Sequence, residues 1–134
     1  MDIYKKKKRR FTRDFKKISK YLKEEKGVSV VLGETTEYTG PFNRQIIIHH
    51  NYDLRNNGLY VLLYEAGRVY LPIGNPEQYS TDELLANSVL REIKAWSLGK
   101  RIAKNLNIKI NQTEWDENIS RGIVSVIKTP KKVW

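Results

Sequence analysis

The sequence predicts a single α+β domain. Its 134 residues are enough for one hydrophobic core but not for two. Two runs rich in β-branched residues, at 28–32 and 45–50, have the composition of strands, and apolar residues recur at helical spacing in several other segments. We therefore expect a small sheet packed on helices.

Most of the positive charge lies near the N-terminus. Of the net charge of +10, residues 1–26 carry +8, from twelve Lys and Arg against four Asp and Glu, and the rest of the chain carries +2. The run KKKKRR at 5–10 repels itself too strongly to fold alone. We expect residues 1–10 to form a flexible basic arm and residues 11–134 to form the domain.

A helix is expected to follow the arm, with two strands after it. Apolar side chains recur at steps of four, three and four, which places them on one face of a helix: Phe11, Phe15, Ile18 and Leu22. Gly27 is expected to end this helix. The strands at 28–32 and 45–50 are bounded by Gly, Pro and Asn, and we expect them to pair as antiparallel neighbours.

Three more helices are expected in the second half of the chain. The first covers 58–69, with Asn56 or Asn57 as its cap and an inner face of Leu59, Leu62, Leu63 and Ala66. The second covers 82–106 and opens with a capping box formed by Ser80 and Glu83. The last begins at Thr113, and its inward residues are Trp115, Ile119, Ile123 and Val126 or Ile127.

The helix over 82–106 carries a carboxylate where apolar side chains are expected. Its inner positions alternate at steps of four and three: Leu85, Val89, Glu92, Trp96, Gly99, Ala103 and Leu106. In the alternative, the buried stripe passes through Val89, Ile93 and Trp96, and Glu92 is exposed. The two arrangements differ in whether Glu92 needs a partner inside the protein.

Two segments resemble motifs of small zincin-type metallopeptidases found in phage and mobile-element genomes. The segment LLYEAGR at 62–68 is similar to a helix of the form L-L-H-E-x-G-H, and EIKAW at 92–96 is similar to a later E-x-x-A-W helix. The resemblance spans about residues 28 to 127, and only these two segments are specific. It implies a zincin-like fold in which two His and a Glu bind zinc and a second Glu activates water.

The resemblance also shows what this chain lacks. The two His positions are occupied by Tyr64 and Arg68, while Glu65 matches the general base and Glu92 the third ligand. A guanidinium has no lone pair for a metal, and a neutral phenol is a poor ligand. We therefore expect no catalytic zinc and no other cofactor, and a non-catalytic pseudoenzyme that acts as a binding or structural component.

The lost metal suggests a role for Arg68. Glu65 and Glu92 would face a partly buried cavity without a cation, which is costly unless they are paired. Our hypothesis is that Arg68 bridges both carboxylates and that the Tyr64 hydroxyl adds a hydrogen bond. Without the resemblance, 62–68 is an ordinary amphipathic helix with an exposed Glu65–Arg68 pair, and Gly67 marks either fraying or close backbone approach.

His49 and His50 offer a rival interpretation. A metal-dependent hydrolase with a rearranged site could use one of them together with Glu65 and Glu92. Adjacent residues of a strand point to opposite faces, so both His can serve one site only if the strand has already ended. Histidines on the surface at a strand end are the simpler interpretation.

The basic segment indicates an acidic partner. Twelve cations within residues 1–26 exceed the needs of solubility, so we expect contact with nucleic acid through its phosphates, or with an acidic protein surface. The residues expected to make this contact are Lys5, Lys6, Lys7, Lys8, Arg9, Arg10, Arg13, Lys16, Lys17 and Lys20. Assembly into a homo- or hetero-oligomer is open. No Cys, no long apolar run and no signal peptide are present, so we expect a protein of the host cytoplasm or the virion that is neither secreted nor bound to a membrane.

Overall fold

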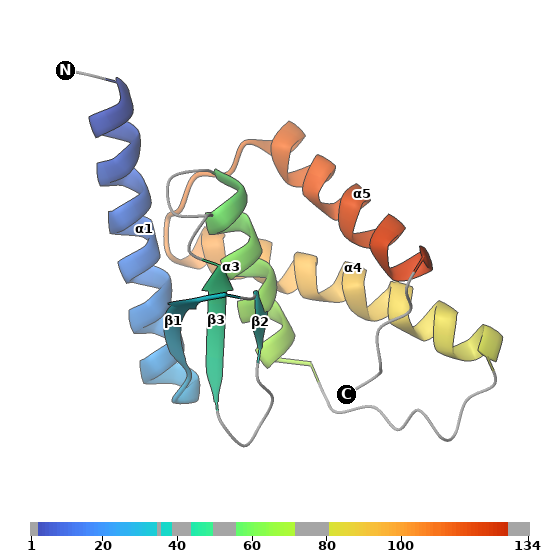
Figure 1. Ribbon diagram of the computed structural model, residues 1–134. Coiled ribbons are helices and arrows are strands. Elements are labelled where there is room, and N and C mark those ends of the chain that lie inside the picture. Colours follow the sequence, from blue (N-terminus) through green and yellow to red (C-terminus); the bar gives the residue numbers. More distant parts are fainter. Residues whose placement is uncertain (1–2, 35, 39–43, 50–55, 72–80, 129–134) are drawn as a thin grey trace.

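The computed structural model describes residues 3–34, 36–38, 44–49, 56–71 and 81–128. These residues form four helices and one three-stranded sheet, which confirms the α+β class. Figure 1 shows α3 at the centre, between the sheet on one side and α4 on the other. The helix α1 packs beside α3 against the sheet, and α5 packs on α4.

The helix α1 (Ile3–Lys26) begins earlier than the sequence predicts. The backbone of residues 3–10 is part of this helix, whereas the sequence predicts a start at Phe11. Lys and Arg are good helix formers, and a helix already held by its apolar face extends at low cost. Ile18 and Leu22 are fully buried, and Gly27, at a φ of +65°, ends the helix as expected.

The sheet consists of β1 (Ser29–Gly33), β2 (Glu37–Tyr38) and β3 (Gln45–His49), in the order β1-β3-β2. The expected antiparallel pairing of the first and last strands is wrong, because β1 and β3 run parallel. The chain leaves β1, crosses to the far edge of the sheet to form β2, and returns antiparallel to it as the central strand β3. The alternate residues Ile46 and Ile48 of β3 are buried.

The helices α3 (Asn56–Val69) and α4 (Thr81–Asn105) lie within two residues of their predicted limits. The four residues expected on the inner face of α3 are all buried. In α4, Glu92 is 4% exposed and Ile93 is 44% exposed, so the alternative stripe through Ile93 is wrong. The side chains of Asn56 and Asn57, and Ser80 of the predicted capping box, lie outside the described part of the chain.

The helices α3 and α4 cross at two glycines. A Cβ atom on Gly67 would overlap the carbonyl oxygen of Ala95 and lie 3.0 Å from the backbone nitrogen of Gly99. A Cβ atom on Gly99 would in turn overlap the carbonyl oxygen of Leu63. Gly67 therefore permits close backbone approach, one of the two roles that the sequence suggests for it.

The helix α5 (Gln112–Lys128) begins one residue before Thr113, and its first turn is capped by Asn111. The Asn111 side-chain oxygen accepts a hydrogen bond of 3.1 Å from the backbone N–H of Glu114. Trp115 is fully buried, and its ring meets the rings of Tyr60 and Trp96 edge-on at 5.2 and 5.1 Å. These aromatic contacts join α5 to both α3 and α4.

Replacing Gly67 by Ala is expected to lower the free energy of unfolding by about 2 to 3 kcal/mol, because the added methyl group meets the α4 backbone, which cannot rotate away. At an exposed helical site the same change would raise stability by up to about 1 kcal/mol. Urea unfolding followed by circular dichroism measures the difference. Ser97→Ala, at an exposed position of α4, is the control, and a Gly67→Ala protein as stable as the natural one would contradict the close crossing.

Candidate functional site

The four residues that the resemblance aligns with a zinc site form one polar cluster. Tyr64, Glu65 and Arg68 lie on α3, and Glu92 lies on the facing side of α4. Tyr64, Glu65 and Glu92 are 5%, 3% and 4% exposed, respectively, so the cluster is closed off from solvent except at Arg68. The close crossing of the two helices brings these side chains together.

Glu92 receives a hydrogen bond from Tyr64. The Tyr64 hydroxyl donates to the Glu92 carboxylate oxygen Oε2 over 2.5 Å, within the buried interface of α3 and α4. Burial, and then the neighbouring carboxylates of Glu92 and Glu65, raise the pKa of the Tyr64 phenol well above its ordinary value of 10.0. Tyr64 therefore stays protonated and remains a donor at neutral pH.

Arg68 pairs with Glu65. Its Nη1 lies 3.4 Å from Oε2 of Glu65, and its guanidinium carbon lies 6.0 Å from the centre of the Tyr64 ring. The proposed contact with Glu65 is therefore present, whereas the donor that reaches Glu92 is the Tyr64 hydroxyl. The Arg68 side chain is 20% exposed and that of Glu65 is 4% exposed. The alternative of an ordinary amphipathic helix with an exposed Glu65–Arg68 pair is therefore wrong.

Trp96 and Gly122 complete the surroundings of Tyr64 and Glu92. The Trp96 ring stacks on the Tyr64 ring at 4.6 Å, and a Cβ atom on Gly122 of α5 would lie 2.6 Å from Oε1 of Glu92. Gly122 thus leaves room for the carboxylate under α5. Within the described residues, the Trp96 indole nitrogen is the buried side-chain nitrogen or oxygen that lacks a hydrogen-bond partner. Sequence analysis missed Gly122, although a glycine inside an amphipathic helix is a signal of close approach.

His49 does not lie with the carboxylates. His49 ends β3, where its backbone N–H donates to the Thr36 hydroxyl over 3.1 Å, and His50 lies outside the described residues. In the part of the chain that the structure describes, no group of three or more His, Cys, Asp and Glu side chains is placed to hold a metal ion. His49 therefore does not form a metal site with Glu65 and Glu92 in this structure.

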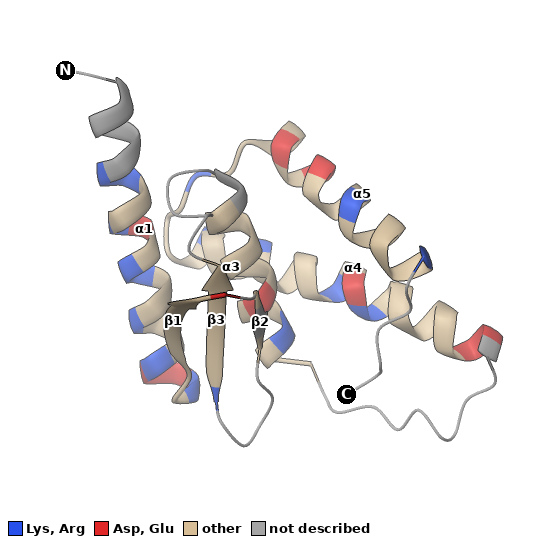
Figure 2. Ribbon diagram, viewed as in Figure 1, with Lys and Arg blue, Asp and Glu red and all other residues tan. Residues whose placement is uncertain are grey.

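Exposed cations lie on the solvent side of α1, and Figure 2 shows Lys and Arg along the part of this helix whose side chains are described. One face of the helix presents exposed residues at steps of four, three, four and three: Arg9, Arg13, Lys16, Lys20 and Lys23. Arg10 is exposed as well, and the side chains of Lys5, Lys6, Lys7 and Lys8 lie outside the described part. We call the five residues from Arg9 to Lys23 the α1 basic face. None of the helices in the described ranges is long and apolar enough to cross a membrane.

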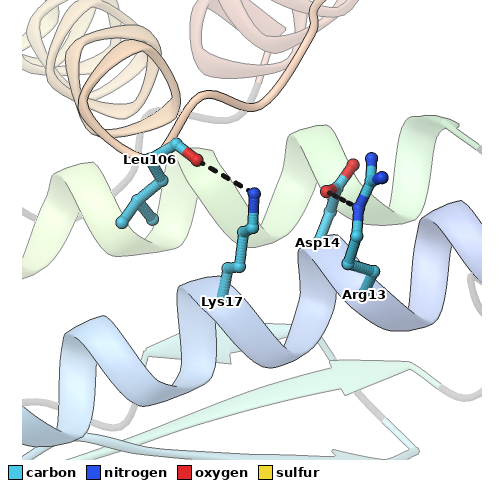
Figure 3. A network of polar contacts seen from close by, with 4 residues as sticks. All are labelled: Arg13, Asp14, Lys17 and Leu106. Atoms are coloured by element: carbon cyan, nitrogen blue, oxygen red, sulfur yellow. Dashed lines mark hydrogen bonds and ion pairs between the residues drawn. The ribbon is translucent and has the colours of Figure 1, made fainter.

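Lys17 has a different role from the other residues predicted to bind a partner. Its ammonium group donates to the carbonyl oxygen of Leu106, just after α4, over 3.3 Å (Figure 3). Carbonyls at a helix end lack partners in their own helix and attract a cation. Lys17 therefore joins α1 to the end of α4, and its assignment to partner binding alone needs correction.

Asp14 is the buried acid of α1. It is 1% exposed, and its Oδ1 accepts a bond of 3.3 Å from Nε of Arg13, whose own side chain is 62% exposed (Figure 3). Arg13 thus shares its charge between a buried carboxylate and the solvent. Its availability to a partner is lower than that of Lys16, which forms no ion pair within the described residues.

Replacing Tyr64 by Phe is expected to lower the free energy of unfolding by about 1 to 3 kcal/mol at neutral pH, because buried Glu92 loses a hydrogen-bond donor. The pH dependence should change too. In the unfolded chain Tyr64 ionises near pH 10, whereas in the folded protein its pKa is higher, so its contribution is complete below pH 10 and is lost as the pH rises further.

The Tyr64→Phe protein should therefore lose stability less steeply above pH 10, by up to about 1.4 kcal/mol per pH unit. Urea unfolding at a series of pH values measures this slope. Tyr21→Phe, which removes a half-buried hydroxyl from the Tyr21–Tyr70 hydrogen bond of 2.8 Å, is the control. Equal stability of Tyr64→Phe and the natural protein at neutral pH would show that the bond to Glu92 contributes nothing.

Comparison with known proteins gives no relative: no family model matches the chain, and no curated protein or solved structure matches it. The function is therefore inferred from the side chains described above.

Proposed function

We propose that this protein is a non-catalytic nucleic-acid-binding protein that contacts phosphates through the α1 basic face. The observation that supports this most is the separation of charge on α1: Ile18 and Leu22 are buried on one side, while five cations are exposed on the other. A helix that only needed solubility would intersperse acids on its outer face. The exposed acids of the described part of α1 are Glu24 and Glu25, both in its last turn, and the contact of Glu24 with Lys20 is long, at 3.9 Å, and exposed.

The dimensions of the α1 basic face suit a phosphate backbone. From Arg9 to Lys23 the helix rises roughly 21 Å, at about 1.5 Å per residue. Neighbouring cations on the face are one helical turn apart, so each can meet a different phosphate. Such contacts release counterions and do not depend on the base sequence. Binding is therefore strong at low salt and not sequence-specific.

The polar cluster supports the view that the core is a scaffold. Under the resemblance to zincin-type metallopeptidases, Tyr64 and Arg68 stand where zinc ligands would, and hydrogen bonding between Tyr64 and Glu92 replaces coordination. We propose that the protein is a pseudo-metallopeptidase of a phage or mobile element. In a virus, a phosphate-binding surface suits a component of the particle close to packaged DNA.

Replacing Lys16, Lys20 and Lys23 together by Gln is expected to weaken binding to duplex DNA of arbitrary sequence. The slope of log K against log salt should fall by up to about 0.9 for each phosphate that the protein no longer neutralises. Fluorescence anisotropy over a range of salt concentrations measures this slope. The matched control replaces Lys94, Lys109 and Lys128, which are exposed on other segments, and removes the same total charge.

Two results would contradict this assignment. If both triple variants lowered the slope equally, net charge and not the α1 basic face would determine binding. If the natural protein bound polyglutamate at low salt but not duplex DNA, the partner would be an acidic protein surface and the assignment to nucleic acid would be wrong.

The pseudoenzyme proposal has its own test. The double substitution Tyr64→His and Arg68→His restores two imidazoles at i and i+4 on α3, and position 64 already reaches Glu92. We expect this variant to bind one zinc ion per chain, measured as metal content after dialysis against zinc and then buffer.

The control adds Glu92→Gln to the double variant, which should lower zinc affinity because one ligand is weakened. A folded double variant that retains no zinc would contradict the zincin-like geometry. Circular dichroism and thermal unfolding establish whether the variant is folded.

A further inference from the structure

A second basic surface lies at the C-terminal end of α4. A pocket of about 470 Å³ is lined by Ser97, Lys100, Arg101, Lys104, Ile108, Ile110 and Gln112. This volume is in the range of sites that hold small ligands. The pocket lies between the last turns of α4 and the segment that leads into α5, and neither the polar cluster nor the α1 basic face contributes to it.

Three cations at one side of the pocket have no acidic partner among the described residues. Lys100, Arg101 and Lys104 fall within two helical turns and are exposed, and no ion pair is formed by any of them in the described ranges. Like charges at such spacing destabilise a helix slightly. An anionic ligand would remove that repulsion, so this end of the pocket suits a phosphate.

The position of Lys100 is fixed by hydrogen bonds. Its ammonium group donates to Oε1 of Gln112 over 2.7 Å, and the Gln112 amide donates to Asp116 over 2.8 Å. This chain of hydrogen bonds links α4 to the first turn of α5 and holds one cation at the rim. A partly ordered donor loses less entropy when it binds a ligand.

Aliphatic side chains also line the pocket, whereas the α1 basic face consists of cations alone. Ile108 is 6% exposed, and Ile110 is partly buried against the core, so aliphatic surface lies beside the three cations. A duplex offers phosphates on a convex backbone and keeps its bases stacked inside. A single strand can place one phosphate on the cations and one unstacked base on the aliphatic floor.

We propose that this pocket binds one nucleotide unit of single-stranded nucleic acid. Arg101 and Lys104 hold the phosphate, and Ile108 and Ile110 contact the base. The inference rests on the proposed function and extends it, because the pocket makes the protein prefer single strands to duplexes of equal length. Lys17 ties α1 to Leu106, so the pocket and the α1 basic face belong to one packed unit.

The test measures anisotropy of three labelled probes of equal length: single-stranded oligothymidylate, the same backbone with abasic sites, and a duplex. The variant Arg101→Gln with Lys104→Gln is compared with Lys94→Gln and Lys128→Gln, which removes two exposed cations outside the pocket. The pocket variant should bind oligothymidylate about tenfold more weakly than the control variant at physiological salt, because the phosphate in the pocket loses both of its cations. Its affinity for the duplex should equal that of the control variant.

The two comparisons test whether the pocket binds a nucleotide through its phosphate and its base. Equal loss in the two double variants, or equal affinity of the natural protein for oligothymidylate and the abasic strand, would overturn the proposal. A variant without Lys16, Lys20 and Lys23 distinguishes failure of the α1 basic face from failure of the pocket. If that variant binds all probes normally while the pocket variant loses affinity for single strands, the role of α1 fails and the pocket assignment stands.

Discussion

The close crossing of α3 and α4 is the constraint on which the rest of the structure depends. Gly67 and Gly99 bring two helix backbones into direct contact, so side chains next to the crossing reach the opposite helix. Tyr64 can touch Glu92, and Trp96 can stack on Tyr64, only because the helix axes are this close. Since α3 also contacts the sheet, α1 and α5, its position relative to α4 determines how the remaining elements pack.

Two different donors stabilise the two carboxylates that are buried at this crossing. Arg68, which is partly exposed, offers its charge to Glu65, and a neutral phenol serves Glu92 deeper in the interface. Burying a full ion pair there would require desolvating a guanidinium as well. A hydroxyl with a raised pKa is less expensive to bury and still donates a strong bond to a charged acceptor.

Helical periodicity predicted most of the fold and part of the cluster. It offered an inner stripe that includes Glu92 beside an alternative through Ile93, and the burial of Glu92 decides for the first. Periodicity within one segment holds no information about which strands pair, so the parallel pairing of β1 and β3 through the two-residue β2 was not predictable. The link from Lys17 to Leu106 and the pocket beyond it depend on contacts between distant segments, which a charge count along the chain cannot reveal.

Some ionic groups of the protein are buried and others are exposed to solvent. Salt screens the exposed groups more strongly than the buried ones. Charges in water are screened over about 8 Å at physiological ionic strength, while buried pairs are screened far less. Raising the salt concentration therefore screens the exposed cations of the α1 basic face and leaves the bond between Tyr64 and Glu92 almost unchanged. Lys17 belongs with the less exposed groups despite its place in the basic segment, because its ammonium group is committed to the end of α4. Under the proposed function, binding to phosphates is therefore reversed by ionic strength without loosening of the core that presents the cations.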